Sequence, residues 1–274
     1  MTGDRAGTGR VALVTGAARG IGAATVAGLA AAGWSVVAVD RGHDDPRLPY
    51  ALGTVAELEA VAADAGRAGP GRVIAHVADT TDPAALGAAV AVAEERFGGL
   101  DAVVAVAGVI AGGVPLWEMP EEQLQAVVDV DLLGPVTAAR VGIPALLRRP
   151  APRDGRYIAV ASAAATRGLP GLAAYGAAKA GVAGLVRGLA TDLRGTGVTA
   201  TGVSPGSTAT PMLDESARLY GLEGAGAFAG QQPVERLLTP GEVAAALVWL
   251  AGPDSSGVTG AVLPVDGGQS GRIG

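Results

Sequence analysis

Tyr175 and Lys179 are four residues apart in the alanine-rich stretch Tyr175-Gly-Ala-Ala-Lys179. Such a stretch favours a helix, which places the two side chains one turn apart on the same face. A tyrosine exchanges protons near neutral pH only if its pKa of about 10 is lowered, and a nearby ammonium does this by favouring the phenolate. Lys179 is the only lysine in a chain that otherwise uses arginine. The pair is therefore predicted to transfer a proton to or from a substrate.

Ser162 is the third residue of this candidate catalytic group. It follows an apolar run that is typical of a buried strand, thirteen residues before Tyr175. Its hydroxyl is expected at the carboxyl end of that strand, where it can hydrogen-bond an alcohol or carbonyl oxygen beside the tyrosine. A lone serine in this position is more often part of a turn, so the prediction depends on the neighbouring pair.

The composition excludes several other chemistries. The chain has no cysteine, which excludes disulfides, thiolate metal sites and a cysteine nucleophile, and two histidines are too few for a three-histidine metal site. No metal is expected. A net charge of −6 argues against nucleic-acid binding. No targeting segment and no apolar run of bilayer length is recognised, so we expect a soluble cytoplasmic protein without a membrane partner.

A glycine-rich turn follows the first apolar run. Gly16, Gly20 and Gly22 allow a sharp turn and the close approach of a pyrophosphate, and the helix that follows offers N–H donors to the phosphates. The intervening Arg19 and Ile21 belong to the same predicted cofactor site. A glycine pattern alone is weak evidence in a chain with 44 glycines, but the strand before it and the helix after it strengthen the prediction.

Acidic residues after the second and third apolar runs indicate which dinucleotide binds. Asp40 is positioned to accept hydrogen bonds from the adenosine ribose, and its charge repels a 2′-phosphate, which favours NAD over NADP. Arg19 and Arg41 could instead pair with such a phosphate or remain solvated. Asp79 and Thr80 are expected near the adenine, with N-capping of the next helix as the competing function of Asp79.

The elements that position these residues alternate between apolar strands and alanine-rich helices. This order predicts a single α/β domain over residues 1–274, a doubly wound parallel sheet with a Rossmann fold. Two segments are long for such connections: 41–54, predicted to be an insertion, and 207–233, predicted to be a substrate flap. The expected strands are 11–15, 35–39, 73–77, 102–106, 157–161, 199–203 and 261–265, and the expected helices are 20–32, 55–67, 83–97, 120–148, 173–194 and 240–251.

In order and spacing, these motifs resemble the short-chain dehydrogenase/reductase family from about residue 10 to residue 268. The resemblance implies a nicotinamide cofactor, Tyr175 as acid/base, Lys179 on the nicotinamide ribose, Ser162 on the substrate oxygen, and a homotetramer. It also implies that Thr208 and Thr210 lie near the carboxamide. The motifs that carry this resemblance are Thr15–Gly22, Asp40, Val106-Ala107-Gly108, Ser162, Tyr175-x-x-x-Lys179, Pro205-Gly206 and Val265-Asp-Gly-Gly268.

The segment 48–54 after Asp40 is similar to the insertion of the mycofactocin-coupled branch of this family. This similarity implies a tightly held NAD, oxidation of an alcohol, and a mycofactocin-type redox partner that re-oxidises the bound cofactor.

The chain departs from the family pattern where the fourth catalytic residue, usually asparagine, is Asp131. In the family, the backbone carbonyl at this position is thought to hold a water that passes protons toward the lysine. Pro135 lacks the N–H that would bond the Asp131 carbonyl, so we expect a local kink and a freed carbonyl. The hypothesis is that the freed backbone carbonyl of Asp131 holds the water of this proton relay. The alternative is that Pro135 serves only the packing of the helix.

The sequence therefore predicts hydride transfer between a nicotinamide and a secondary alcohol or ketone, with a small hydrophobic or terpenoid-like alcohol favoured by the apolar residues of the flap. One alternative is an NADPH-dependent ketoreductase of 3-oxoacyl thioesters, against which Asp40 argues. Another is a non-catalytic NAD-binding sensor, which would not need Tyr175.

Overall fold

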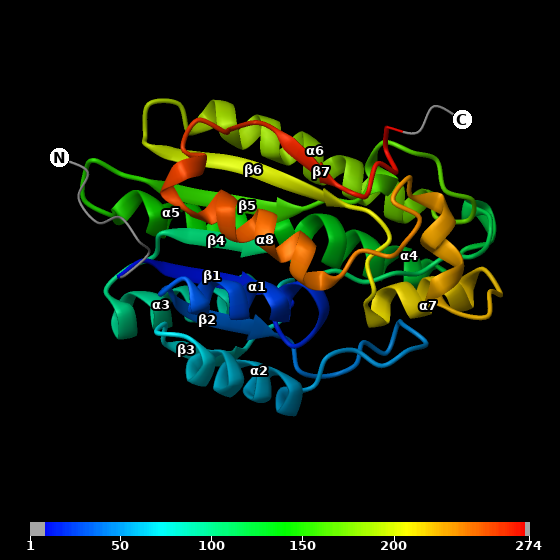
Figure 1. The fold of residues 1–274 in the computed structure, drawn as a ribbon, viewed down its shortest axis with the longest axis horizontal. Helices are drawn as coiled ribbons and strands as arrows, with labels where there is room; N and C mark the ends of the chain where they lie inside the picture. The colour runs from blue at the N-terminus through cyan, green and yellow to red at the C-terminus, as the bar shows by residue number, and fades with distance from the viewer. Residues whose placement is uncertain (1–8, 272–274) are drawn as a thin grey trace.

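The computed structural model describes residues 9–271 and contains one parallel sheet of seven strands in the order β3-β2-β1-β4-β5-β6-β7. The chain crosses from β3 back to the centre and then outward to β7, so the strand order reverses between β1 and β4 (Figure 1). Ligands bind at this reversal in open α/β sheets. The strands are β1 Val11–Thr15, β2 Ser35–Asp40, β3 Val73–Val77, β4 Ala102–Ala105, β5 Gly155–Val160, β6 Val198–Pro205 and β7 Val262–Val265.

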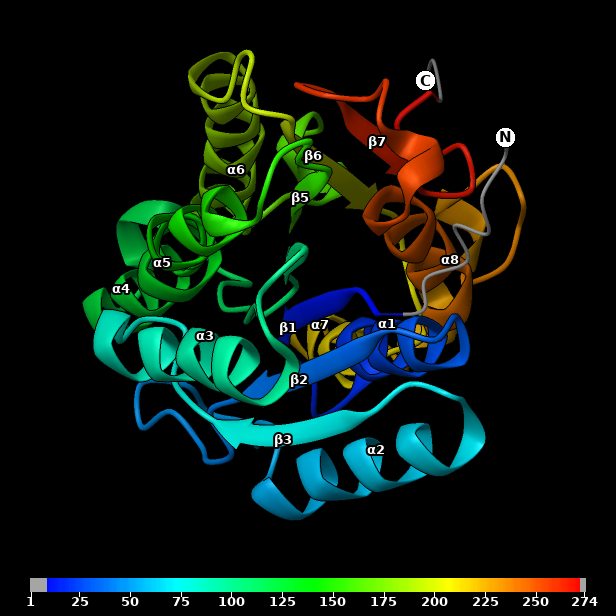
Figure 2. The same cartoon turned by 90° about the vertical axis from the view of Figure 1, so that its left-hand side faces the viewer.

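Helices cover both faces of the sheet, as Figure 2 shows. One layer packs α1 between α2 and α8, and the other holds α3, α5 and α6. The predicted doubly wound Rossmann-type fold is therefore confirmed. The helices are α1 Gly20–Ala31, α2 Val55–Ala68, α3 Pro83–Phe97, α4 Glu121–Val128, α5 Gly134–Arg148, α6 Ala173–Asp192, α7 Pro211–Leu219 and α8 Pro240–Ala251.

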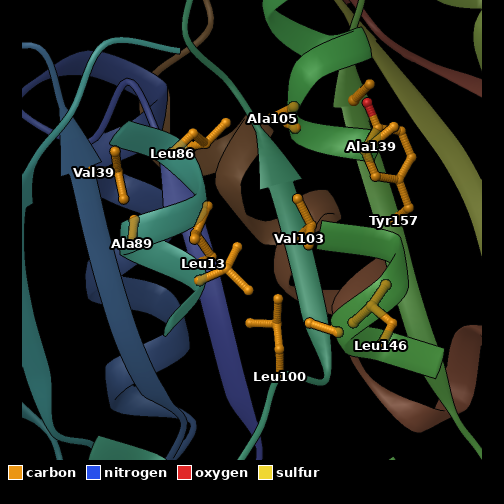
Figure 3. Packing of buried hydrophobic residues seen from close by; sticks show 14 of the residues in the cluster. Leu13, Val39, Leu86, Ala89, Leu100, Val103, Ala105, Ala139, Leu146 and Tyr157 are labelled. Carbon is orange, nitrogen blue, oxygen red and sulfur yellow. The ribbon is translucent and has the colours of Figure 1, made fainter. Parts of the chain in front are cut away.

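The strands are apolar on both faces because both faces are buried. One core cluster joins the sheet to α3, α5 and α6, with Leu13, Val103 and Leu146 among its fully buried members (Figure 3). A second cluster joins the opposite face to α1, α2 and α8. Burying aliphatic side chains of this size stabilises a fold by about 1.5–3 kcal/mol each. Packing on both faces holds the strands in place, and with them the carboxyl edge of the sheet.

The helix predicted over 120–148 is interrupted. A π-helical turn, Asp129–Leu133, separates α4 from α5, and Gly134 N–H bonds back to the Asp129 carbonyl. The expected irregularity before Pro135 thus takes this form. The buried Tyr157 hydroxyl donates to the Pro135 carbonyl at 2.6 Å and anchors the start of α5.

The segment 207–233, expected as an irregular flap, contains the helix α7. Thr210 caps it by accepting a bond from Leu213 N–H, and Pro211 occupies its first turn. The glycines after this helix obscured it in the sequence. Figure 1 shows α7 and the 41–54 loop at the same end of the sheet, beyond the arrowheads of the strands.

The helical run Glu121–Arg148 is long and apolar enough to cross a membrane by length and composition. However, 56% of its most apolar window is buried inside the protein, and α5 packs against α3, β4 and β5. This run is therefore a core element of the fold.

Candidate active site

A cavity of about 590 Å³ opens at the carboxyl edge of the sheet. It is lined by every residue predicted above to bind cofactor or substrate, with the exception of Asp131. The topology explains this convergence, because the ends of all parallel strands meet at one edge. The predicted residues in its wall are Gly16, Arg19, Gly20, Ile21, Gly22, Asp40, Arg41, Asp79, Thr80, Val106, Ala107, Gly108, Ser162, Tyr175, Lys179, Pro205, Gly206, Thr208 and Thr210.

Ser162, Tyr175 and Lys179 come together at one place in this wall. Lys179 Nζ lies 5.7 Å from the centre of the Tyr175 ring and donates to the Val160 carbonyl at 3.3 Å. Ser162 caps the short turn after β5 by accepting from Ala164 N–H at 3.1 Å. Tyr175 and Lys179 are 8% and 3% exposed, so water screens their charges poorly. This geometry permits proton exchange with an oxygen held in the cavity.

Asp131 lies behind Lys179 and is fully buried. Its Oδ1 is 3.0 Å from Lys179 Nζ and accepts from Val109 N–H at 3.2 Å. Its Oδ2 has no hydrogen-bond partner within residues 9–271. Sequence reasoning assigned the contact with the lysine to the backbone carbonyl, through water. In the structure the Asp131 side chain reaches the ammonium directly.

The ionisation of Tyr175 depends on opposing effects. Burial raises its pKa above the ordinary value, and the negative charge of Asp131 acts in the same direction. Lys179 and a hydrogen bond from Ser162 lower it, but less. The net direction is therefore opposite to the one expected from the lysine alone. Burial lowers the pKa of Lys179 itself, but Asp131 and Tyr175 more than offset this, so its pKa is raised overall.

The glycine turn forms a cradle that side chains would fill. A Cβ on Gly22 would lie 1.9 Å from the Gly16 carbonyl oxygen, and one on Gly16 would lie 2.7 Å from Ala107 Cα. Gly16 and Gly20 also have positive φ angles of 66° and 59°. Thr15, which the sequence analysis did not select, accepts from the N–H groups of Val106 and Ala107 and joins β1 to the loop after β4. The turn therefore fits a dinucleotide pyrophosphate at the start of α1.

Asp40 faces the turn from the end of β2. Its Oδ2 accepts from Ala18 N–H at 3.0 Å, which leaves lone pairs for a ribose hydroxyl. The insertion passes close beside it, since a Cβ on Gly53 would lie 3.3 Å from Asp40 Oδ1. Arg19 donates to the Ala51 carbonyl at 2.6 Å. The 41–54 segment thus borders the part of the cavity that is predicted to hold the adenosine.

Alternating charges hold the insertion in place. Asp45, 2% exposed, pairs with Arg41 and Arg47 at 2.8 Å each, and Arg47 reaches Asp129 at 2.7 Å. Arg41 also lies 3.4 Å from Asp79. Arg41 is therefore neutralised by carboxylates, which disfavours its predicted alternative role of pairing with a 2′-phosphate.

The structure corrects the helix-capping alternative for Asp79. Asp82, not Asp79, caps α3 by accepting from Ala84 and Ala85 N–H groups at 2.8 and 3.2 Å. Asp79 accepts from the N–H and hydroxyl of Thr81. Its position in the cavity wall agrees with the predicted place near an adenine.

The remaining wall is mostly apolar and was only partly predicted. Six apolar residues of the flap were expected to contact the substrate. Five of them line the cavity, namely Met212, Leu213, Tyr220, Leu222 and Phe228, whereas Leu219 lines a separate pocket. The Tyr220 hydroxyl donates to the Pro170 carbonyl at 2.7 Å and ties α7 to the loop after β5. Leu52, Gly53, Ile110, Gln231 and Gln269 also line the cavity and were not selected from the sequence. They carry no local motif, and only the tertiary fold brings them together.

Comparisons with known proteins identify the family of this chain. A family model described as enoyl-(acyl carrier protein) reductase matches residues 16–270. The short-chain reductase protein NovJ of Streptomyces niveus is 38% identical over 94% of this chain and 93% of its own. The cis-4-hydroxycyclohexanecarboxylate dehydrogenase of Sinomonas cyclohexanicum is 37% identical over 95% and 96%.

A solved structure gives the same answer in three dimensions. Carveol dehydrogenase from Mycobacterium avium in complex with NAD superposes with a TM-score of 0.91 and 30% identity, covering 98% of this chain and all of the other. The chain belongs to the short-chain dehydrogenase/reductase family and is an NAD-dependent oxidoreductase.

Proposed function

We propose that this protein interconverts a secondary alcohol and its ketone, with a small, largely hydrocarbon substrate of terpenoid-like character. The observation that carries the proposal is the convergence of Ser162, Tyr175 and Lys179 on the cavity that also holds the glycine cradle. When bound, NAD accepts or returns the hydride at the carbinol carbon. The apolar side chains of α7 and the following turn support a hydrocarbon substrate body.

Each polar residue has one task in this proposal. Tyr175 removes the hydroxyl proton during oxidation and returns it during reduction. Ser162 donates a hydrogen bond to the substrate oxygen as it gains negative charge. Lys179 favours the phenolate and hydrogen-bonds the nicotinamide ribose. Asp131 holds the ammonium in position from behind, and its exposure of 0% makes it a positioning residue that does not touch the substrate.

For the cofactor half we propose that Asp40 binds the adenosine ribose, with Gly16, Arg19, Gly20, Ile21 and Gly22 around the pyrophosphate. The clamped insertion beside Asp40 supports a slowly released NAD. Such retention is consistent with the predicted mycofactocin-type redox partner. A homotetramer, which the family resemblance implies, and a cytoplasmic location, which was expected because no targeting segment was recognised, remain predictions.

Tyr175→Phe tests the catalytic assignment. It should abolish turnover of a secondary alcohol, by a factor of about 10² or more, while NAD affinity stays close to wild type because the ring is retained. Activity would be followed by NADH absorbance and binding by protein fluorescence. A variant that turns over at the wild-type rate would refute the role of Tyr175.

Two alternatives have less support. Reduction of 3-oxoacyl thioesters with NADPH is disfavoured by the Asp40 carboxylate and by the pairing of Arg41 with Asp45 and Asp79. A non-catalytic NAD sensor would not need the buried tyrosine–lysine pair. Denaturing the purified protein and identifying the released dinucleotide separates the proposal from the ketoreductase: retained NAD supports the proposal, whereas an empty protein that uses added NADPH contradicts it. Loss of turnover in Tyr175→Phe with NAD binding retained separates the enzyme from the sensor.

A further inference from the structure

A buried carboxamide lies in the cavity wall beside the 207–233 segment without a complete set of hydrogen bonds. Gln269 lines the cavity and is only 4% exposed. Its Nε2 donates to Gln231 Oε1 at 3.4 Å, and its Oε1 has no partner among residues 9–271. An unsatisfied buried amide oxygen costs free energy unless a ligand or water completes it. Gln231 is exposed at the end of the turn after α7, so the two amides form a polar spot in an apolar wall.

Hydrogen bonds fix the backbone on both sides of Gln269. The Gln269 N–H donates to the Asp266 carbonyl at 3.0 Å, and the Gln269 carbonyl accepts from Arg167 at 2.7 Å. The Asp266 carboxylate accepts from Gly268 and Ser270 N–H groups on either side. The turn after β7 is therefore fixed independently of any ligand, which limits the positions that the Gln269 side chain can take in the cavity wall.

The charges of the wall limit what this amide can bind. Within the described part of the chain, the charged side chains that line the cavity are Arg19, Asp40, Arg41, Asp79 and Lys179. The first four surround the predicted adenosine and pyrophosphate, and Lys179 belongs to the catalytic group. The guanidinium of Arg167 is engaged by the Gln269 carbonyl and does not line the cavity. The polar spot therefore suits a neutral group better than a carboxylate.

We propose that Gln269 determines specificity by hydrogen-bonding a second neutral oxygen of the substrate, a hydroxyl or a carbonyl that is separate from the reacting one. This inference rests on the proposed alcohol–ketone function. With the amides as described, Gln269 offers an oxygen to a hydroxyl donor. Exchanging oxygen and nitrogen in both amides keeps the bond between them and offers an N–H to a carbonyl.

The test compares probes that differ by one oxygen. Cyclohexanol and 1,4-cyclohexanediol are oxidised with NAD, and cyclohexanone and 1,4-cyclohexanedione are reduced with NADH. We expect wild type to favour the doubly oxygenated probe in kcat/KM, and Gln269→Leu to reduce that preference on the order of tenfold, mainly through KM. A larger loss for the diol indicates the oxygen as the contact, and a larger loss for the dione indicates the N–H.

Equilibrium binding separates this inference from the proposed function when each probe meets the cofactor with which it cannot react: the alcohols are bound to the NADH complex and the ketones to the NAD complex. If the diol or the dione binds more tightly than its partner probe and Gln269→Leu removes the difference, the inference holds even if turnover fails. Equal loss for both members of a pair, or no discrimination by wild type, overturns it. Gln123→Leu, outside this cavity, is the matched control and should leave both ratios unchanged.

Discussion

The carboxylate of Asp131 changes the electrostatics of Tyr175, the proposed proton acceptor. Because it raises the pKa of Tyr175 and partly neutralises Lys179, Asp131→Asn should lower the pKa of the phenol. The basic form of Tyr175 is needed for oxidation, so the rise of kcat/KM with pH should move to lower pH. Rates measured from pH 6 to pH 10 check this, and an unmoved profile would contradict it.

Asp131→Leu gives a contrasting outcome at the same position. It leaves the Lys179 ammonium buried without its carboxylate, and removing one partner of a buried ion pair costs about 3–5 kcal/mol of stability. Asp131→Asn preserves shape and an acceptor for the ammonium, so its loss of stability should be smaller. Urea unfolding of the two variants distinguishes the charge effect from a loss of fold.

Residues that lie close together in the sequence, within one helix or one turn, could be selected from the sequence because local geometry places them. The pair Tyr175 and Lys179 shares one helix face, and Gly16 and Gly22 belong to one turn, so local geometry is sufficient to place them. Asp131 could be aligned by resemblance, but its direct contact with Lys179 depends on how the π-helical turn packs against α6. Gln269 follows β7, and its place in the cavity wall is set by the whole sheet.

The ion pairs that connect the 41–54 insertion to the π-helical turn should control the rate at which NAD dissociates. Arg47 joins Asp45 to Asp129, so Arg47→Gln should loosen the 41–54 loop and weaken NAD binding by about tenfold, corresponding to about 1.4 kcal/mol. Stopped-flow release of NADH measures the change. Arg67→Gln, in an exposed pair with Asp64, is the matched control and should have no effect.

The π-helical turn Asp129–Leu133 determines where the Asp131 side chain lies relative to Lys179. Pro135→Ala restores an N–H and allows a regular α-helix from α4 into α5, which would rotate Asp131 away from Lys179. Turnover should therefore fall several-fold at pH 7, while NAD binding is retained. Steady-state rates across pH provide the measurement, and unchanged rates at every pH would indicate that the proline serves packing alone.

Element prediction succeeded where the hydrophobic pattern was continuous. The predicted bounds of β1 and α3 match the structure, and the predicted end of β2 differs from the observed one by a single residue. The helix α7 was missed because it is short and lies in a glycine-rich segment, where Thr210 and Pro211 were the available signals. The break between α4 and α5 depends on Pro135, which predicts an irregularity but not its π-helical form.

Binding of the cofactor should raise the free energy of unfolding of the protein, because a ligand that binds only the folded state shifts the unfolding equilibrium. NAD at a hundred times its Kd adds about 2.7 kcal/mol. At about 2–4 °C per kcal/mol for a chain of this size, the Tm should rise by about 5–10 °C. NADP at the same concentration should give a much smaller rise if Asp40 binds the adenosine ribose as proposed, because its carboxylate would then repel the 2′-phosphate.

Asp40→Ser makes that comparison specific to the carboxylate. Serine retains an oxygen that can accept from Ala18 N–H, so the glycine turn keeps its support, but the charge that repels a phosphate is gone. The Tm rise with NAD should shrink as the ribose loses its partner, and the rise with NADP should grow. Differential scanning calorimetry over a series of ligand concentrations gives both values. A variant that still responds only to NAD would place cofactor selection in the clamped insertion around Arg41 and Asp45 rather than in Asp40.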